Sequence, residues 1–375
     1  MKIECTEELD RRKRLGIPES FCSVPFTTLQ LEPDGKVTCC RQKGSDFFVG
    51  DLKKNSLLEI WNGRQMQEWR QEFLVESVQT CRSEIHHRKC QLCPEYNLMK
   101  SDFQLDPYQS QMPERISFNL NGKCNLECIM CDIWRQPNGF YDRFGLWDQL
   151  VALTANLKEI ELLSGEPFIQ KDTYRLIDQI SALRPDCLWT ITTNANWKMN
   201  DLIREKLDLI KLKYIIVSLD CTRPESYAVI RKNGNFQLAI RTIKDLRDYS
   251  QEREQRGMLG FKVRINFLYQ KENWMELPES FELTEKLGVD GFRTFLYEPS
   301  HLSLLSLSER DRTNIIEHFM KMDAYKIQRS MRVILPLLES LRPADRFHFV
   351  MEIRRRIDQG SHHTFFSGMQ DESSR

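Results

Sequence analysis

The hydrophobic pattern is most regular in the middle of the chain, between residues 115 and 300. Six short runs rich in apolar and β-branched residues predict strands, near 115–121, 158–163, 188–193, 213–219, 261–268 and 291–297. Between these runs, apolar residues recur at spacings of three and four, which predicts helices near 145–156, 170–183, 199–209, 224–252 and 274–287. Alternating strands and helices form parallel sheets. We therefore expect an α/β fold, a partial (β/α)6 TIM-type barrel over 115–300, with its active site at the C-terminal ends of the strands.

The pattern before residue 115 is different. Two short alternating runs flank the turn Pro33-Asp34-Gly35 and predict a β-hairpin. Ser56 is a predicted N-cap, and two helical patterns follow it. We expect a small α+β domain over 1–100. Residues 101–114 contain few apolar side chains, so we interpret them as a linker.

The pattern after residue 300 is helical. Helices are predicted over 308–325, 330–341 and 343–358, the first of them capped by Ser308. We therefore expect a C-terminal helical segment over 301–360. The final residues, 361–375, are polar and irregular and predict a mobile tail.

Charge and hydropathy exclude some classes of partner. Lys+Arg and Asp+Glu both number 54 among the 375 residues, so the net charge gives no case for binding nucleic acid or an anionic membrane. No apolar run approaches the ~20 residues of a transmembrane helix. The first residues are charged and lack an apolar signal core, so we expect a cytoplasmic protein.

The cysteines change this picture most. The chain has 12, of which seven precede residue 94, three lie within 124–131, and Cys187 and Cys221 stand alone. In a reducing compartment, clustered cysteines indicate metal binding rather than disulfides. The uneven distribution therefore predicts two metal-binding regions.

The second region is the triplet Cys124, Cys128 and Cys131, which follows the first predicted strand of the barrel. Three thiolates can hold three irons of a 4Fe–4S cluster and leave the fourth iron open, whereas four cysteines are the ordinary set. A zinc site is the alternative, but zinc usually takes four ligands, and no histidine lies between His87 and His301.

The spacing Cys-x3-Cys-x2-Cys, with Met130 before the last cysteine, resembles the cluster motif of the radical S-adenosylmethionine (radical SAM) superfamily. The resemblance implies that the open iron binds the amino and carboxylate groups of S-adenosylmethionine. It also implies that an electron from the cluster cleaves this molecule to a 5′-deoxyadenosyl radical.

Motifs at later strand ends strengthen the resemblance. The sequence 164–167, Ser-Gly-Glu-Pro, resembles the Gly-Gly-Glu-Pro motif of the family, with serine in the first glycine position. Thr-Thr-Asn at 192–194, Ser-Leu-Asp at 218–220 and Tyr-x-x-Ile-Arg at 227–231 resemble further family segments. The residues that the resemblance implies for binding S-adenosylmethionine are Ser164, Gly165, Glu166, Asn194, Ser218 and Arg231. Arg231 would pair with the methionine carboxylate.

The N-terminal cysteines resemble the Twitch domain, the shortened form of the SPASM domain that carries auxiliary 4Fe–4S clusters in many radical SAM enzymes. The implied cluster ligands are Cys22, Cys40, Cys90 and Cys93. Cys39 is an alternative to Cys40, although alternation along a strand would point the two thiols in opposite directions, and Cys81 is an alternative to any of the four. A structural zinc site with the same thiolates also remains open. In most relatives this domain follows the barrel, and here it precedes it.

Cys221 follows the fourth predicted strand of the barrel, at the expected rim of the site. A thiol there can donate a hydrogen atom to a substrate radical, which makes Cys221 a candidate catalytic residue. The alternative is a small buried side chain with no chemical role.

Together these features predict a radical SAM enzyme that abstracts hydrogen from a peptide or small-molecule substrate. The auxiliary cluster would accept an electron from the substrate radical, and a flavodoxin or ferredoxin would supply electrons to the first cluster. The alternatives are a non-enzymatic iron–sulfur protein for electron transfer or redox sensing, and a radical SAM modifier of nucleic acid. Neutral net charge weighs against the last.

Overall fold

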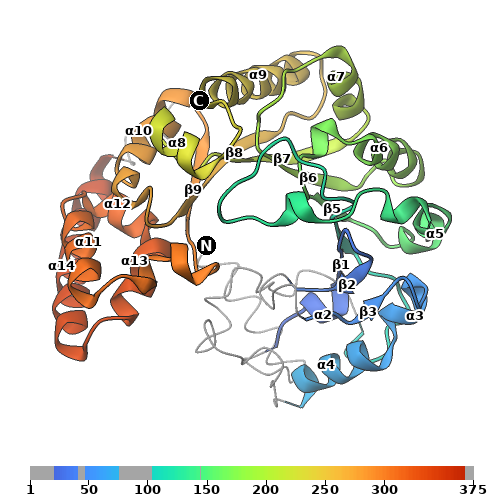
Figure 1. The fold of residues 1–375 in the computed structure, drawn as a ribbon, viewed down its shortest axis with the longest axis horizontal. Coiled ribbons are helices and arrows are strands. Elements are labelled where there is room, and N and C mark those ends of the chain that lie inside the picture. Colours follow the sequence, from blue (N-terminus) through green and yellow to red (C-terminus); the bar gives the residue numbers. More distant parts are fainter. Residues whose placement is uncertain (1–20, 41–46, 76–103, 144, 368–375) are drawn as a thin grey trace. The chain divides into compact units, whose positions relative to one another are not determined.

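The computed structural model describes residues 21–40, 47–75, 104–143 and 145–367, with backbone only from 359 onward. The chain divides into two compact units. The first unit comprises residues 1–124, 133–192 and 200–213, and the second comprises 125–132, 193–199 and 214–375. Figure 1 labels the helices and strands of both units.

In the first unit the strands lie in the order β3-β2-β1-β4-β5-β6. Their bounds are β1 Thr28–Leu31, β2 Lys36–Thr38, β3 Gly50–Asp51, β4 Arg115–Phe118, β5 Glu159–Leu162 and β6 Leu188–Thr193. Strands β1, β2 and β3 pair antiparallel, which confirms the predicted hairpin. From β1 through β4 and β5 to β6 every pairing is parallel.

The helices of the first unit are α2 Val24–Thr27, α3 Leu57–Trp61, α4 Arg64–Leu74, α5 Leu146–Leu153, α6 Lys171–Leu183 and α7 Asp201–Asp208. Two of them, α3 and α7, begin at a side-chain cap, provided by Ser56 and Asn200. Ser56 and Glu59 form a capping box at the start of α3, as Ser56 predicts, because each satisfies an unpaired backbone N–H of the other.

The second unit contains three parallel strands and a larger set of helices. The strands are β7 Lys211–Ser218, β8 Lys262–Tyr269 and β9 Asp290–Phe295. The helices are α8 Pro224–Ile230, α9 Phe236–Gln255, α10 Glu279–Leu287, α11 Glu309–Phe319, α12 Ala324–Arg329, α13 Met331–Glu339 and α14 Pro343–Ser367. The predicted α/β fold with a mostly parallel sheet is confirmed.

Three predicted helices differ from the structure. The helix expected over 224–252 is broken into α8 and α9, because Asn233 has a φ of 67° and Asn235 caps α9. The helix expected over 274–287 starts as a short 3-10 turn and becomes α10 only after Pro278. The helix expected over 308–325 ends at Phe319, and α12 begins at Ala324. Helix α14 continues to Ser367, into the residues for which a mobile tail was predicted.

The structure also joins segments that the sequence separates into a domain and a linker. Strand β1 pairs with β4 from Thr28↔Arg115 to Leu31↔Phe118, so the N-terminal hairpin extends the sheet of β4. The expected linker is held in place by hydrogen bonds to its backbone. Trp61 Nε1 donates to Gln111 O at 2.8 Å, and Arg70 Nη1 donates to Pro107 O at 2.7 Å.

Arg70 is the centre of this attachment. Its guanidinium has no exposed surface and lies over the Trp61 ring, 4.2 Å from the ring centroid. Nε donates to Pro25 O at 2.9 Å, and Nη1 also donates to Asn62 Oδ1 at 3.2 Å. Burial lowers the pKa of Arg70 to about 10, so it remains a cation at neutral pH. One side chain of α4 thus connects this helix to α2, to the end of α3 and to the 104–111 segment.

We expect Arg70→Met to lower the free energy of unfolding by about 3 kcal/mol, because it leaves buried carbonyl groups without donors. Urea denaturation followed by circular dichroism measures the change. Arg64→Met is the matched control, since Arg64 lies on the same helix, is exposed and pairs with Glu68; its effect should stay below about 0.5 kcal/mol. Equal losses in the two variants would contradict this role of Arg70.

Candidate functional site

The strand ends that carry the predicted motifs have an unusual backbone. A residue other than glycine with positive φ follows each of three strands: Ser164 after β5 (151°), Ala195 after β6 (56°) and Asp220 after β7 (66°). Such conformations cost about 1–3 kcal/mol each and persist only where the surroundings fix them, commonly at binding sites. Ser164 occupies the position at which the family motif has glycine. The strained turns therefore fall on the predicted motifs.

The loop after β5 fixes the residue that precedes the first cysteine of the triplet. Lys123 O accepts hydrogen bonds from Glu166 N and from Gln170 Nε2, both at 2.9 Å. Gly165 has a φ of 52°, and a Cβ there would lie 2.1 Å from Lys123 O. Only glycine, which has no Cβ, allows the backbone at position 165 to lie this close to Lys123 O. Ser164 Oγ also donates to Asn121 O.

Gln170 in this loop is a residue that the sequence analysis missed. Its amide group bridges Lys123 O and Ser164 O, at 2.9 Å and 2.8 Å, and its side chain is buried. Glu166 has no exposed surface and accepts a hydrogen bond from Phe168 N at 3.2 Å. No local pattern marks Gln170, because it lies between two helical segments as an ordinary polar residue.

The three cysteines of the triplet differ in exposure: Cys124 is half-buried, Cys128 buried and Cys131 exposed. Within the second unit, the loop is held by backbone hydrogen bonds to the end of α8. Glu127 N donates to Lys232 O at 3.1 Å, and Ile129 N donates to Ile230 O at 3.0 Å. In the described part of the chain, no three Cys, His, Asp or Glu side chains converge on one metal ion. In a 4Fe–4S cluster each thiolate binds its own iron, so a donor set of thiols alone fits this group.

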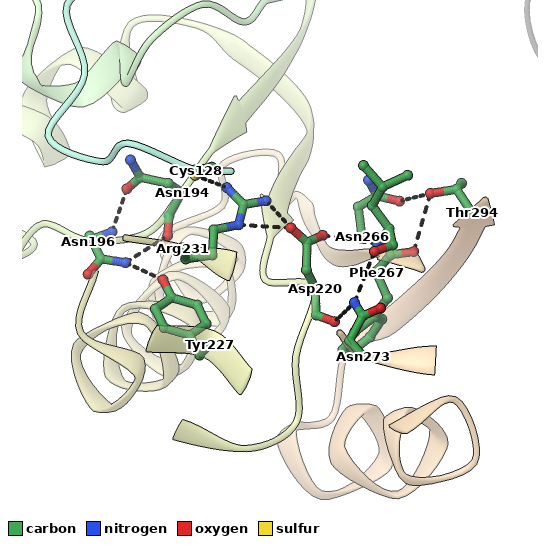
Figure 2. A network of polar contacts seen from close by, with 11 residues as sticks. Cys128, Asn194, Asn196, Asp220, Tyr227, Arg231, Asn266, Phe267, Asn273 and Thr294 are labelled. Carbon is green, nitrogen blue, oxygen red and sulfur yellow. Dashed lines mark hydrogen bonds and ion pairs between the residues drawn. The ribbon is translucent and has the colours of Figure 1, made fainter. Parts of the chain in front are cut away.

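A network of amides follows β6 (Figure 2). Asn196 Nδ2 donates to Tyr227 Oη at 2.6 Å, and Asn196 Oδ1 accepts from Asn235 N at 2.6 Å. Asn125, next to the first cysteine, donates to Asn196 O at 2.7 Å and accepts from Asn194 Nδ2 at 2.9 Å. The sequence analysis identified Asn194 alone. The network thus connects the loop that carries the three cysteines (the cluster loop) to the residues after β6, and connects those residues to α8 and to the start of α9.

Asp220, Arg231 and Cys128 form a second buried group (Figure 2). Arg231 Nε and Nη2 lie 2.8 Å and 2.6 Å from Asp220 Oδ2, and Arg231 Nη1 donates to Cys128 Sγ at 3.5 Å. Burial alone would lower the pKa of Arg231. The adjacent Asp220 carboxylate and Cys128 sulfur outweigh this effect and raise the pKa of Arg231 above its ordinary value. Burial raises the pKa of Cys128, and Arg231 counteracts this. The pairing of Arg231 with a methionine carboxylate stays a prediction.

The remaining predicted residues of the barrel lie near the end of β7. Ser218 is half-buried and in register with Asn266 of β8, whose Oδ1 accepts from Thr294 Oγ1 at 3.3 Å. Cys221 has no exposed surface, and burial raises the pKa of its thiol. The place of Cys221 at the rim of the site and its hydrogen-donating role both stay predictions.

Part of the predicted auxiliary site can be located. Cys22 is half-buried, and Cys39 and Cys40 are both buried, with 2% and 9% of their surface exposed. Strand β2 ends at Thr38, so alternation along a strand does not separate these two thiols, contrary to expectation. The other candidate ligands lie outside the described residues: Cys81, Cys90 and Cys93.

Among the helices that the structure describes, none combines the length and the apolar character needed to cross a membrane.

Comparisons with known proteins agree with these features. A probable GTP 3′,8-cyclase of Methanocaldococcus jannaschii is 27% identical over 179 residues, which span 46% of this chain and 56% of that protein. A probable GTP 3′,8-cyclase of Saccharolobus islandicus is 27% identical over 218 residues, 57% of this chain and 67% of that protein. The first match thus spans little more than half of the relative.

The solved structures that match this chain include those of SuiB and HydG. Streptococcus suis SuiB is 17% identical with a TM-score of 0.41, over 84% of this chain and 69% of SuiB. The FeFe-hydrogenase maturase HydG of Carboxydothermus hydrogenoformans is 13% identical with a TM-score of 0.34, over 80% of this chain and 67% of HydG.

Two family models match the chain itself. The model of the radical SAM superfamily matches residues 118–283, and the model of the SPASM iron–sulfur cluster-binding domain matches residues 22–94. The first range contains the cysteine triplet, and the second contains Cys22, Cys40, Cys90 and Cys93. The cofactors of these two domains are 4Fe–4S clusters and S-adenosylmethionine. The chain belongs to the radical SAM superfamily and carries a SPASM domain ahead of its radical SAM domain.

Proposed function

We propose that this chain is an enzyme that cleaves S-adenosylmethionine reductively and abstracts a hydrogen atom from an organic substrate. When bound by Cys124, Cys128 and Cys131, the cluster supplies the electron that generates the 5′-deoxyadenosyl radical. The observation that supports this most is the fixed backbone around the triplet: Lys123 O accepts two hydrogen bonds, and Asn125 is held by two amides.

The chain's own residues position the cofactor in this proposal. The Ser164-Gly165-Glu166 loop orients the start of the cluster loop and offers polar groups to the methionine end. Asn194 and Ser218 contact the nucleoside and methionine parts. Asn194 follows β6 and Ser218 is the last residue of β7, at the strand ends where parallel α/β folds place their ligands. A purely electron-transferring iron–sulfur protein needs no such loops, which is why we favour the enzyme.

The proposed substrate is a small molecule or a peptide. The two curated relatives described above are named as GTP cyclases, so GTP is the first compound to test as a substrate. The N-terminal cysteines would hold an auxiliary cluster that accepts an electron from the substrate radical, with Cys22, Cys40, Cys90 and Cys93 as proposed ligands. A low-potential donor such as flavodoxin or ferredoxin would supply electrons.

The proposal predicts that the reconstituted, reduced protein forms 5′-deoxyadenosine from S-adenosylmethionine, as measured by liquid chromatography and mass spectrometry. Cys124→Ala should form none above a protein-free blank, because the open-iron cluster loses a ligand. Cys187→Ala is the control, since it removes a buried thiol outside the predicted site and should retain activity. Activity of Cys124→Ala equal to that of the control would overturn the proposal. Iron analysis of Cys124→Ala should still find about four irons if the N-terminal cysteines hold a cluster.

A second prediction concerns Gly165. In Gly165→Ala the new methyl group would meet Lys123 O, so the backbone before Cys124 must move. We expect S-adenosylmethionine to bind about tenfold more weakly, a loss of about 1.4 kcal/mol measured by isothermal titration calorimetry.

Gly145→Ala controls for backbone strain in the Gly165 experiment. Gly145 also has positive φ, at 62°, but a Cβ there meets no atom within 4 Å. Both variants pay about 1–2 kcal/mol for the left-handed conformation, and only Gly165→Ala should lose affinity. Equal affinities in the two variants would show that this loop does not position the cofactor site.

A further inference from the structure

We propose that Arg231 and Asp220 together set the reduction potential of the cluster held by the triplet, with Arg231 acting through its hydrogen bond to Cys128. This inference rests on the proposed function, because it requires a cluster at this loop. It gives Arg231 a different task from the pairing with a methionine carboxylate that its motif implies.

The geometry of Arg231 supports this assignment. All three guanidinium nitrogens have partners: Nε and Nη2 at Asp220 Oδ2, and Nη1 at Cys128 Sγ, 3.5 Å away. The side chain is buried, with 8% of its surface exposed. A guanidinium held in this way presents one N–H to the sulfur (Figure 2). These contacts use three of the five N–H donors of the guanidinium.

Asp220 keeps the guanidinium in this position. Its carboxylate has no exposed surface, and Oδ1 accepts a hydrogen bond from Leu268 N at 3.0 Å. Its carbonyl oxygen accepts from Asn273 Nδ2 at 2.8 Å, and its φ is 66°. Asp220 is therefore fixed by β8 and by the turn after β8, and it does not depend on Arg231 alone for its position.

The physical effect follows from charge. A 4Fe–4S cluster that accepts one electron from a low-potential donor becomes more negative by one charge. An N–H donor and a cation at a ligand sulfur stabilise that reduced form and raise the potential, and a nearby carboxylate lowers it. Both effects are strong in a buried, low-dielectric site. Arg231 and Asp220 should therefore shift the potential in opposite directions.

The test is a redox titration of the full-length reconstituted protein, monitored by electron paramagnetic resonance. The signal followed is the reduced-cluster signal that disappears in Cys124→Ala, so the N-terminal cluster is not measured. In Arg231→Gln, the ratio of reduced to oxidised cluster at a fixed potential should fall about tenfold, equivalent to about 59 mV for one electron. In Asp220→Asn, which keeps the guanidinium but removes the negative charge, the ratio should rise.

Three further variants separate this effect from structural damage. Arg293→Gln removes another buried guanidinium of the second unit, one whose hydrogen bonds go to Ser280, Gly291 and Thr284, and should leave the potential unchanged. Loosened packing would instead shift Arg231→Gln and Asp220→Asn in the same direction. Breaking a buried pair can prevent folding, in which case Arg231→Lys, which keeps the charge, is compared with the double variant Arg231→Gln/Asp220→Asn. The lysine variant should have the higher potential.

The outcomes distinguish the two proposals. Shifts of opposite sign, or the higher potential in Arg231→Lys, support the inference. Unchanged potentials, shifts of the same sign, or equal potentials in the Arg231→Lys and double variants overturn it and leave the proposed function standing. A loss of S-adenosylmethionine affinity in Arg231→Gln at an unchanged cluster potential would also overturn the inference, since that result assigns Arg231 to the methionine carboxylate. The proposed function would again stand. If Cys124→Ala removes no signal, no cluster forms at this loop, and both proposals fail.

Discussion

Asp220 is a buried acid with no contact with solvent, and three residues of the second unit, Arg231, Leu268 and Asn273, bond to it. A buried carboxylate is tolerated only when it is paired and hydrogen-bonded. Arg231 supplies the pair, the backbone of β8 supplies an N–H, and the break between α8 and α9 follows directly after the arginine. The remaining nitrogen of the Arg231 guanidinium, Nη1, donates a hydrogen bond to Cys128 Sγ. Removing either charge would leave the other buried without an opposite charge. The pair thereby also fixes the environment of the Cys128 thiol.

A second constraint acts on the backbone before the triplet. Lys123 O is approached so closely by the loop after β5 that a side chain at position 165 would collide with it. The neighbouring residue Ser164 adopts a positive φ although it is not glycine. Conformational strain is thus concentrated beside the residues that would hold the cluster, which is typical of preorganised binding sites.

Much of the fold could be predicted from the sequence, because strands and helices of an α/β protein are encoded by local periodicity. Strand 188–193 has the predicted bounds, and the other five barrel strands lie within three residues of theirs. The motifs were recognisable for the same reason, since their residues are adjacent in the chain. The division of helix 224–252 was missed, because Asn233 and Asn235 act through backbone geometry rather than through hydrophobic spacing.

The contacts that organise the site could not be predicted in this way. Asn125 and Asn196 are 71 positions apart, and Cys128 and Arg231 are 103 positions apart. Nothing in the spacing of Gln170, Asn196 or Asp220 indicates their partners. The sequence left two interpretations of Cys221 open, because a position just after a strand can face either the solvent or the core, and the structure shows that Cys221 is buried.

The proposed function requires that the cluster of the triplet has an open iron that binds S-adenosylmethionine. Electron–nuclear double resonance on the reduced protein, with S-adenosylmethionine labelled with 15N in its amino group, detects this bond. We expect a 15N hyperfine coupling to the cluster that is absent in Cys124→Ala. A bound, labelled molecule that shows no coupling to the cluster would contradict it.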